Sequence, residues 1–276
     1  MEFSKNSFNK IINFANNEEK NKHYHNLSMI ENNLNINKSD VYNNWADSYN
    51  DYVNKEGYVG PRQLTEKILP FILNLISNSV IIDELNILDF GCGTGLLGLE
   101  IYNNLNKLGI KNNLNGIDIS KEMIKYAKKT EAYSNIFCYD LISDSSIPKH
   151  NISESVESAK STESTESAES AEPAESAESE MNAYIHDHIY KEAFDIVVSC
   201  GVFLEGHVSL DRIHDVLLPL VKKNGLLAFT VRASFLSEFP EFFSKLNKNK
   251  NVAFFKNYSI NYLNGIPACA IIIKVL

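Results

Sequence analysis

The stretch Ile87-Leu88-Asp89-Phe90-Gly91-Cys92-Gly93-Thr94-Gly95 decides the fold class of this chain. A short apolar run leads into an acid and three glycines at alternate positions, and an amphipathic segment follows at 96–108. This order predicts a strand, a tight loop and a helix. Glycines suit such a loop because they adopt positive φ without steric cost and let a ligand lie against bare backbone. The acid just before the glycines would repel phosphate, so a cationic ligand is favoured.

The same loop also fits a second class of protein. Gly93-x-Gly95-x-x-Gly98 satisfies the dinucleotide fingerprint, which predicts an NAD-dependent oxidoreductase, although a lone match of this kind is weak. Two further acids, Asp118 and Asp140, close apolar runs at 116–118 and 136–140. An acid in the first of these positions is expected for any cofactor with ribose hydroxyls. Alternatively, both acids simply end strands as turn residues.

The rest of the chain alternates between strand-like and helix-like segments. Apolar strands are predicted at about 86–90, 113–118, 136–139, 194–199 and 226–231, with helices at 95–108, 120–129 and 209–222. Alternation of this kind predicts a parallel sheet covered by helices. Two β-rich runs, 252–262 and 267–275, are joined by Asn264-Gly265, a strong hairpin signal. We therefore predict an α/β fold with a Rossmann-like, seven-stranded, mostly parallel sheet, a C-terminal antiparallel hairpin, and helices on both faces.

The domain organisation follows from composition. Residues 1–40 are rich in Asn and Lys and are predicted to form an extension, whereas 41–276 form one domain. Within 41–55, aromatic residues recur at helical spacing and predict a helix with one aromatic face. The segment at about 143–190 is dominated by Ser, Ala and Glu. Its low apolar content and high like charge predict a disordered insertion.

Charge and cysteine usage narrow the function classes. The formal charge is −9, of which residues 151–180 contribute −8 through nine Glu and Lys160, so the rest of the chain carries −1. A nearly neutral domain gives no general basic surface for nucleic acid. The four cysteines lack C-x-x-C spacing, and the isolated pair His186 and His188 is a poor metal site. We expect no metal, no membrane segment and a cytoplasmic location.

Several motifs together resemble a known family. The order Asp-x-Gly-x-Gly-x-Gly after an apolar strand is similar to the first motif of class I S-adenosylmethionine-dependent methyltransferases. The segment 194–208, FDIVVSCGVFLEGHV, resembles F-D-x-V-V-S-x-G-V-F-x-x-G-H of the Williams-Beuren syndrome region methyltransferase-like proteins. The segments 42–51 and 57–61 are similar to that family's Y-D-x-W-A-x-x-Y-D and G-Y-x-x-P, with Asn43 in place of the first acid and Asn50 in place of the second unless Asp51 serves.

The resemblance implies S-adenosylmethionine as the cofactor and assigns residues to it. Gly91, Gly93 and Gly95 would pack against its methionyl part, with Asp89 fixing the ammonium through the loop or a water. Asp118 would accept hydrogen bonds from the ribose hydroxyls. The remaining implied contacts are Ile119 and Met123 on either side of the adenine, Asp140 and Leu141 at its edge, Cys200 through its backbone, and Tyr49 over the methionine carboxylate or sulfonium. Met123 equally fits ordinary helix core.

Methyl transfer from a sulfonium depends mainly on alignment, and a base is needed only when the acceptor is protonated. Glu205 and His207 follow the fourth strand, where the acceptor is expected, and His is able to take a proton near neutral pH. Alternatively, His207 only shapes the turn. The acceptor itself is unidentified and is expected to be a small molecule rather than nucleic acid. A protein that binds the cofactor without catalysis is the third function class, beside the methyltransferase and the oxidoreductase.

Overall fold

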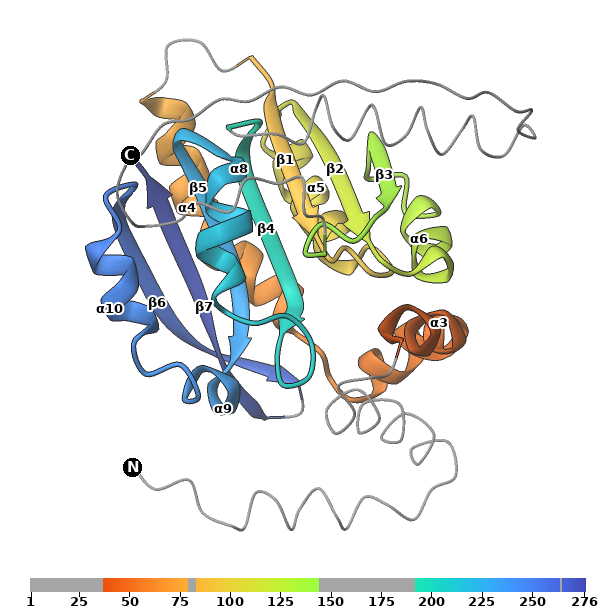
Figure 1. The fold of residues 1–276 in the computed structure, drawn as a ribbon. Helices are drawn as coiled ribbons and strands as arrows, with labels where there is room; N and C mark the ends of the chain where they lie inside the picture. Colours follow the sequence, from red (N-terminus) through yellow and green to blue (C-terminus); the bar gives the residue numbers. More distant parts are fainter. Residues whose placement is uncertain (1–36, 79–82, 144–191, 264) are drawn as a thin grey trace, which may run out of the picture.

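The computed structural model describes residues 37–78, 83–143, 192–263 and 265–276, and a seven-stranded sheet forms its centre (Figure 1). The strand order is β3-β2-β1-β4-β5-β7-β6. The first five strands pair in parallel, and β7 runs antiparallel to both β5 and β6. The strands are β1 (Leu85–Phe90), β2 (Asn112–Asp118), β3 (Asn135–Cys138), β4 (Phe194–Phe203), β5 (Val221–Arg232), β6 (Val252–Leu263) and β7 (Ile266–Val275).

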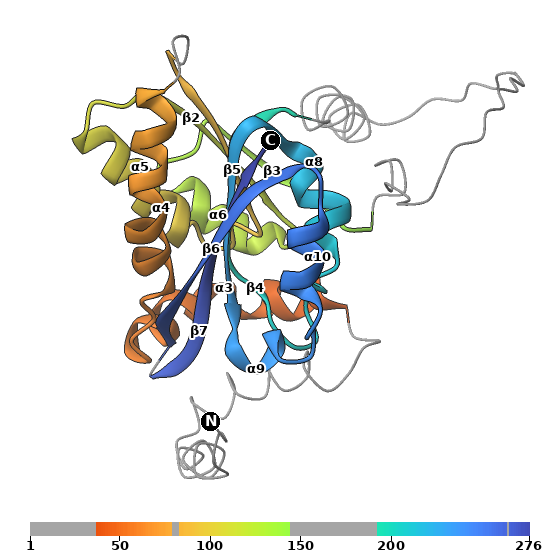
Figure 2. The same ribbon diagram turned by 90° about the vertical axis from the view of Figure 1, so that its left-hand side faces the viewer.

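Helices cover both faces of this sheet, which stands edge-on between them in Figure 2. On one face, α4 (Gly60–Ser77) and α5 (Leu96–Lys107) bury apolar residues such as Leu64 and Ile101. On the other face, the π-helical turn η1 (Ile213–Leu217), α8 (Leu218–Leu220), α9 (Ala233–Leu236) and α10 (Phe242–Lys248) bury a second apolar core. The central strands are buried from both sides, which explains their nearly continuous apolar runs.

Two further helices frame one end of the sheet. α6 (Lys121–Lys128) contacts β2 and β3, and α3 (Lys38–Lys55) crosses below the carboxyl ends of the parallel strands (Figure 1). The aromatic face of α3 is buried at Trp45 and Tyr52 and packs with Met123 of α6 in a third apolar cluster. α3 therefore covers the edge of the sheet at which α/β proteins bind their ligands.

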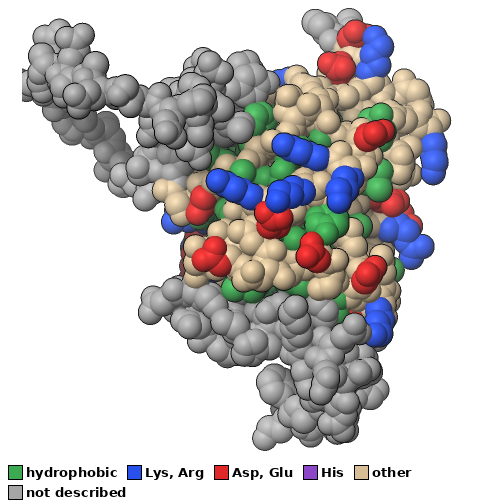
Figure 3. All heavy atoms as spheres, turned by 90° about the vertical axis from the view of Figure 1, so that its right-hand side faces the viewer, with side chains coloured by type: hydrophobic (Ala, Val, Ile, Leu, Met, Phe, Trp, Pro, Cys, Tyr) green, Lys and Arg blue, Asp and Glu red, His purple; other side chains and the backbone are tan. Residues whose placement is uncertain are grey.

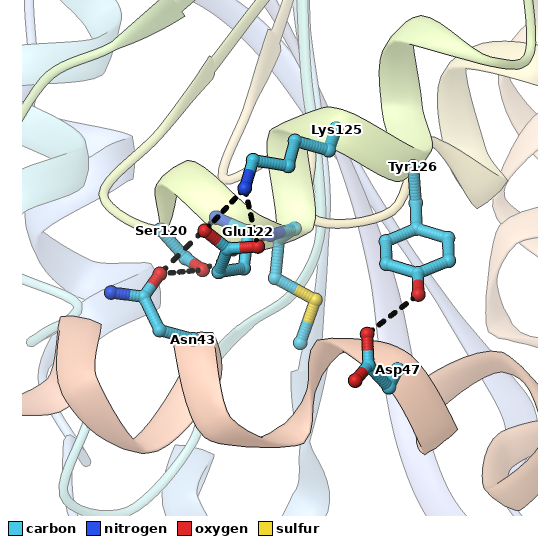
Figure 4. Close-up of polar contacts among 7 residues, drawn as sticks. Asn43, Asp47, Ser120, Glu122, Lys125 and Tyr126 are labelled. Atoms are coloured by element: carbon cyan, nitrogen blue, oxygen red, sulfur yellow. Dashed lines mark hydrogen bonds and ion pairs between the residues drawn. The ribbon is translucent and has the colours of Figure 1, made fainter.

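Polar contacts fix α3 on α6 (Figure 4). Asn43 Oδ1 accepts hydrogen bonds from Ser120 Oγ (2.7 Å) and from the backbone N–H of Glu122 (3.2 Å). One turn later, Tyr126 donates its hydroxyl proton to Asp47 Oδ1 at 2.7 Å. Asn43 replaces an acid of the resembled motif. Its side-chain oxygen accepts hydrogen bonds at the N-terminus of α6, where the backbone N–H groups of the first turn have no partner within the helix.

Most of the predicted elements are confirmed, including the two-residue connection between β6 and β7, which pair at Leu263 and Ile266. The helix predicted at 209–222 is wrong in extent, because only η1 and α8 form there and β5 already begins at Val221. β4 also continues beyond residue 199 to Phe203 through an irregularity in its pairing with β5. The predicted N-terminal extension and the predicted Ser/Glu insertion lie outside the described residues, apart from residues 37–40 and 143.

None of the helices in the described ranges is long and apolar enough to cross a membrane.

Candidate cofactor site

A cavity of about 230 Å³ lies at the carboxyl ends of β1, β2 and β4 and is bounded by α3. Most of the site residues implied by sequence meet there. The cavity is lined by Tyr49, Gly91, Gly93, Asp118, Ile119, Met123, Asp140, Leu141, Cys200 and His207. Three others, Asp89, Gly95 and Glu205, lie outside its lining.

The three glycines of the loop after β1 all have positive φ, but their surroundings differ. Gly93 (φ +54°) faces open space, since a Cβ there would meet no atom within 4 Å. A Cβ on Gly91 would collide with Val202, and one on Gly95 would lie 3.1 Å from Ala127 Cα at the end of α6. Gly93 is therefore the position at which bare backbone faces the cavity, whereas Gly91 and Gly95 permit close packing behind the loop.

Asp118 at the end of β2 ties this loop to the next strand. Its Oδ2 accepts the backbone N–H of Gly93 (2.8 Å), and its Oδ1 accepts that of Ser120 (2.9 Å). Burial raises the pKa of Asp118, while these N–H groups oppose the rise. Each oxygen retains a lone pair, so the carboxylate is still able to accept hydroxyl donors from the cavity. Asp118 thus acts as a turn residue and as a cavity residue at once.

Asp89 lies behind the loop with 1% of its surface exposed. Its Oδ2 accepts a hydrogen bond from the Tyr133 hydroxyl at 2.7 Å, and its Oδ1 has no hydrogen-bond partner among the described residues. Burial raises the pKa of Asp89 to about 7, against the opposing hydrogen bond from Tyr133. Tyr133 also packs so closely on Gly98 of α5 that no side chain fits there. The third glycine of the apparent dinucleotide fingerprint therefore serves helix packing by a tyrosine.

The residues at the β2 and β3 ends form the far wall of the cavity. Asp140 accepts hydrogen bonds from the backbone N–H groups of Ile142 and Ser143, both at 3.1 Å, so it also shapes a local turn. Met123 is only 2% exposed and touches both the cavity and the apolar cluster under α3. The sequence offered two interpretations of Met123, a contact with the adenine and ordinary helix core. The side chain lies between the cavity and the core, so the two interpretations are compatible.

Cys200 and three tyrosines line the opposite wall. β4 carries Cys200, whose Sγ lies 3.1 Å from the Tyr58 hydroxyl and 3.4 Å from Thr230 Oγ1. Burial raises the pKa of the Cys200 thiol to about 12, so it stays protonated and is a poor nucleophile. Tyr49 packs edge-on against Trp45 with ring centroids 5.1 Å apart. This wall offers aromatic faces and neutral hydroxyl groups to a bound molecule.

His207 links the segment after β4 to α3. Its Nδ1 lies 3.0 Å from the carbonyl oxygen of Glu205, which accepts only, so Nδ1 carries the proton. Its Nε2 is then the acceptor of a hydrogen bond from the Tyr42 hydroxyl, with an O···N distance of 2.6 Å. Lys38 Nζ donates to the backbone oxygen of His207 at 2.8 Å. Glu205 itself takes part through its backbone, because its side chain is exposed and the residue does not line the cavity.

The environment of His207 predicts a pH effect on stability. Burial, together with Lys38 and Arg232, lowers the pKa of His207 to about 4. Unfolded His takes up its proton near pH 6.5, so this group's contribution to the free energy of unfolding falls as the pH drops from about 6.5 toward 4. The contribution of Asp89 to the free energy of unfolding has the opposite sign. Because the pKa of Asp89 is raised in the folded state, this contribution grows as the pH falls below about 7. We expect His207→Gln to lose less melting temperature than wild type between pH 7.5 and 5.0. An equal loss in both proteins would contradict this.

Sequence reasoning missed several residues at this site. Lys38 lines the cavity but gave no signal, and Tyr42 and Tyr58 belong to the resembled motifs but were given no role at the site. Tyr133 was missed entirely, because nothing in its local sequence marks it as the partner of Asp89. No group of His, Cys, Asp or Glu among the described residues is arranged to hold a metal ion, and His186 and His188 lie outside those residues.

These features fit S-adenosylmethionine. Its methionine part needs a backbone surface without side chains, which Gly93 supplies. Its ribose needs a carboxylate with free lone pairs, which Asp118 supplies. It carries no phosphate, and the loop that would hold one has a buried carboxyl, Asp89, directly behind it.

Comparisons with known proteins agree with this fit. Residues 81–139, which hold the glycine loop, Asp118 and β3, match the family model described as "Methyltransferase domain". The CurJ carbon methyltransferase superposes with a TM-score of 0.54 at 10% identity, covering 96% of this chain and 70% of that one. A search of curated protein sequences found no match.

Three further similar structures have TM-scores below 0.5. The plantazolicin methyltransferase BpumL, solved with S-adenosylhomocysteine, gives 0.49 at 16% identity over 89% of this chain and 99% of that one. Magnesium protoporphyrin IX methyltransferase from Synechocystis PCC 6803, solved with S-adenosylmethionine, gives 0.48 at 12% identity over 86% and 97%. This chain spans 53% of the DszA carbon methyltransferase, at a TM-score of 0.46 and 12% identity over 78% of this chain.

The match over residues 81–139, the strand order and the glycine loop together show that the chain contains a class I S-adenosylmethionine-dependent methyltransferase domain.

Proposed function

We propose that the acceptor of the methyl group is a small molecule. The observation that carries this proposal is the cover over the cavity. α3 and the segment after β4 meet across it, because Lys38 Nζ donates to the His207 carbonyl (2.8 Å) and Tyr42 donates to its ring (2.6 Å). A covered cavity of this kind favours a compact acceptor over a polymer.

The surface beside the cavity supports the same choice. α6 carries the exposed lysines 121, 125 and 128, and α3 carries the exposed Asp40, Asp47 and Asp51. Figure 3 shows both charges close together on this face. Nucleic acid is normally bound by a continuous basic surface, which this face does not present.

We also infer a relation to the Williams-Beuren syndrome region methyltransferase-like proteins. Three separate segments carried that resemblance, and members of each line one cavity. These members are Tyr42 and Tyr49, then Tyr58 and Pro61, and finally His207. The convergence of distant motif residues on one site supports a shared function rather than a chance likeness in sequence.

The proposed division of labour separates binding from transfer. Gly93 and Asp118 hold the cofactor, Gly91 lines the cavity and packs on Val202, and Gly95 and Asp89 support the loop from behind. The bound cofactor supplies an electrophilic methyl group on its sulfonium. The remaining walls, at Ile119, Met123, Asp140, Leu141, Tyr49 and Cys200, orient it. His207 and Tyr42 face the methyl acceptor, and His207 is the base that removes its proton. Alignment within this enclosed cavity provides most of the acceleration.

Replacement of Asp118 tests the binding half. Asp118→Ala removes the acceptor for the ribose hydroxyls and also frees the Gly93 N–H. We expect the affinity for S-adenosylhomocysteine to fall by about 1–3 kcal/mol, the scale of lost charge-assisted hydrogen bonds. Isothermal titration calorimetry measures this. Asp83→Ala is the control, because Asp83 is exposed and its ion pair with Lys111 lies at the surface. A folded Asp118→Ala protein with normal affinity would remove Asp118 from the site.

A screen with labelled S-adenosylmethionine tests the acceptor class. Label should appear in the small-molecule fraction of a metabolite extract and should be absent from added RNA, DNA and protein. Label in a polymer would overturn the proposal, and cofactor binding without labelling of any fraction would favour a non-catalytic protein.

The cytoplasmic location expected from the sequence stays a prediction.

A further inference from the structure

Lys38, the first residue of α3, places a cation at the wall of the cofactor cavity beside Tyr42 and His207. Its ammonium donates a hydrogen bond to the backbone oxygen of His207 at 2.8 Å, which is its one hydrogen bond within the described ranges. None of the acids in those ranges forms an ion pair with it. An ammonium carries three N–H donors, so two donors of Lys38 are left for water or a bound molecule.

The charge of Lys38 does not stabilise the fold. A cation is unfavourable in the first turn of a helix, where the helix dipole is positive. The start of α3 is capped without it, since the Asn37 side chain accepts the backbone N–H of Ser39 at 3.1 Å. Burial lowers the pKa of Lys38, and the attraction of Asp140 opposes this only in part. The ammonium has therefore lost hydration without gaining an equal counter-charge, which a bound anion would supply.

Asp140 does not fill that role, because its charge is engaged elsewhere. Its carboxylate accepts hydrogen bonds from the backbone N–H groups of Ile142 and Ser143, both at 3.1 Å, and from the Ser143 hydroxyl at 2.7 Å. Asp140 is also exposed, so water and salt screen its field. An anion beside Lys38 in the cavity is therefore attracted more by the ammonium than it is repelled by Asp140.

The charge of Lys38 acts at the end of the cavity where the acceptor is expected. Burial is the main cause of the lowered pKa of His207, and the charge of Lys38 adds to it. At the glycine loop, in contrast, the pKa of Asp118 is set by burial and by backbone N–H groups. The methionyl carboxylate of the cofactor is proposed to lie at that loop, and the sulfonium brings a further positive charge toward the acceptor. Two cations facing the acceptor favour a negatively charged molecule.

We propose that Lys38 binds a negatively charged oxygen of the methyl acceptor, which makes the acceptor a small organic acid; this rests on the proposed small-molecule methyltransferase function. The two N–H donors that remain on Lys38 hold the acid group. The hydrogen bond to the His207 carbonyl keeps the ammonium next to the residue proposed as the base. An ammonium is a compact point charge without a preferred plane, so it binds carboxylates and phosphates alike. A test therefore needs one acid of each kind.

Three related probes test the charge of the acceptor: benzoate, phenyl phosphate and the neutral benzamide. Saturating S-adenosylhomocysteine is present throughout and occupies the place of the cofactor's own carboxylate. Calorimetry should show that at least one acid binds at least about 10-fold more tightly than benzamide, the scale of a hydrogen bond to a charged group. The tighter acid identifies the preferred group as a carboxylate or a phosphate. Benzamide binding as tightly as both acids, or no binding of either acid, would overturn the proposal.

Substitution of Lys38 assigns the preference to this side chain. Lys38→Met removes the charge and keeps an unbranched apolar stem, so the affinity for the preferred acid should fall at least about 10-fold, with benzamide unchanged. Lys38→Arg should fall between Met and wild type. Lys121→Met is the matched control, since Lys121 is likewise the first residue of a helix, α6, but is exposed and does not line the cavity. An unchanged affinity for the acid in Lys38→Met, an equal loss in Lys121→Met, or a parallel loss of benzamide binding would each overturn the proposal.

Calorimetry with S-adenosylhomocysteine alone keeps this test separate from the proposed function. Lys38→Met should bind S-adenosylhomocysteine as tightly as wild type. A loss as large as that of the acid would place Lys38 on the cofactor and overturn the proposal. If wild type binds S-adenosylhomocysteine but shows no preference for an acid, only the acid proposal fails. If the labelled-cofactor screen marks a polymer, the small-molecule function fails whatever the probes show.

Discussion

Gly93→Val should lower the affinity for S-adenosylhomocysteine at least about 100-fold, or about 2.8 kcal/mol. A Cβ at Gly93 would point into open cavity, so the branched side chain would occupy the space that the ligand needs. The substitution also forces a β-branched residue to φ +54°, which costs about 1–2 kcal/mol of stability. Calorimetry on protein that circular dichroism shows to be folded separates the two effects.

Gly109→Val is a matched control for this prediction. Gly109 has φ +70° and also faces open space, but it follows α5 at the opposite end of the sheet from the cavity. Both variants should lose similar stability, and only Gly93→Val should lose binding. Normal binding by a folded Gly93→Val protein would show that the ligand does not lie on this loop.

His207→Asn should lower turnover about 100-fold with little change in S-adenosylhomocysteine affinity. Positioned bases contribute about 10²- to 10⁴-fold, and a base with a pKa of about 4 falls at the low end because its driving force at neutral pH is small. The fixed tautomer leaves the Nε2 lone pair of His207 as the basic site. In the absence of a substrate, this lone pair accepts the hydrogen bond from Tyr42. Single-turnover rates with an acceptor from the labelled screen measure the effect.

Tyr42→Phe separates this role from a structural one. It removes the hydroxyl that contacts His207 and keeps the stacking of residue 42 on Trp45. Turnover should fall by less than in His207→Asn, because the His207 lone pair survives. If His207→Asn instead lowers only the melting temperature and keeps turnover per folded molecule, His207 shapes the turn and is not the base.

The sequence predicts the sheet well because its signals are local and repeated. The apolar strands and the Asn264-Gly265 connection each specify their own element, and parallel strands need crossover helices. The segment after β4 is different. Leu210, Ile213 and Leu217 have helical spacing, yet only η1 and α8 form, and β5 extends back to Val221. Tertiary pairing with β4 overrides the local pattern there.

Site residues that end a strand could be predicted from the sequence. Those that come into contact only through the tertiary structure could not. Asp118 and Asp140 follow from strand order. Tyr133, in contrast, reaches Asp89 from a loop 44 residues away, and Tyr42 reaches His207 across 165 residues. No periodicity encodes such contacts. The cover formed by α3 was also missed, since an amphipathic aromatic helix looks the same over a core and over a cavity.

Titration of the folded chain with S-adenosylhomocysteine and with NAD tests the central claim most directly. The account predicts saturable binding of one S-adenosylhomocysteine per chain, competed by S-adenosylmethionine and unaffected by NAD. The buried Asp89 behind the loop and the use of Gly98 for packing Tyr133 both disfavour a pyrophosphate. Saturable binding of NAD, with no effect of S-adenosylhomocysteine, would contradict the account and restore the dinucleotide reading of the glycine loop.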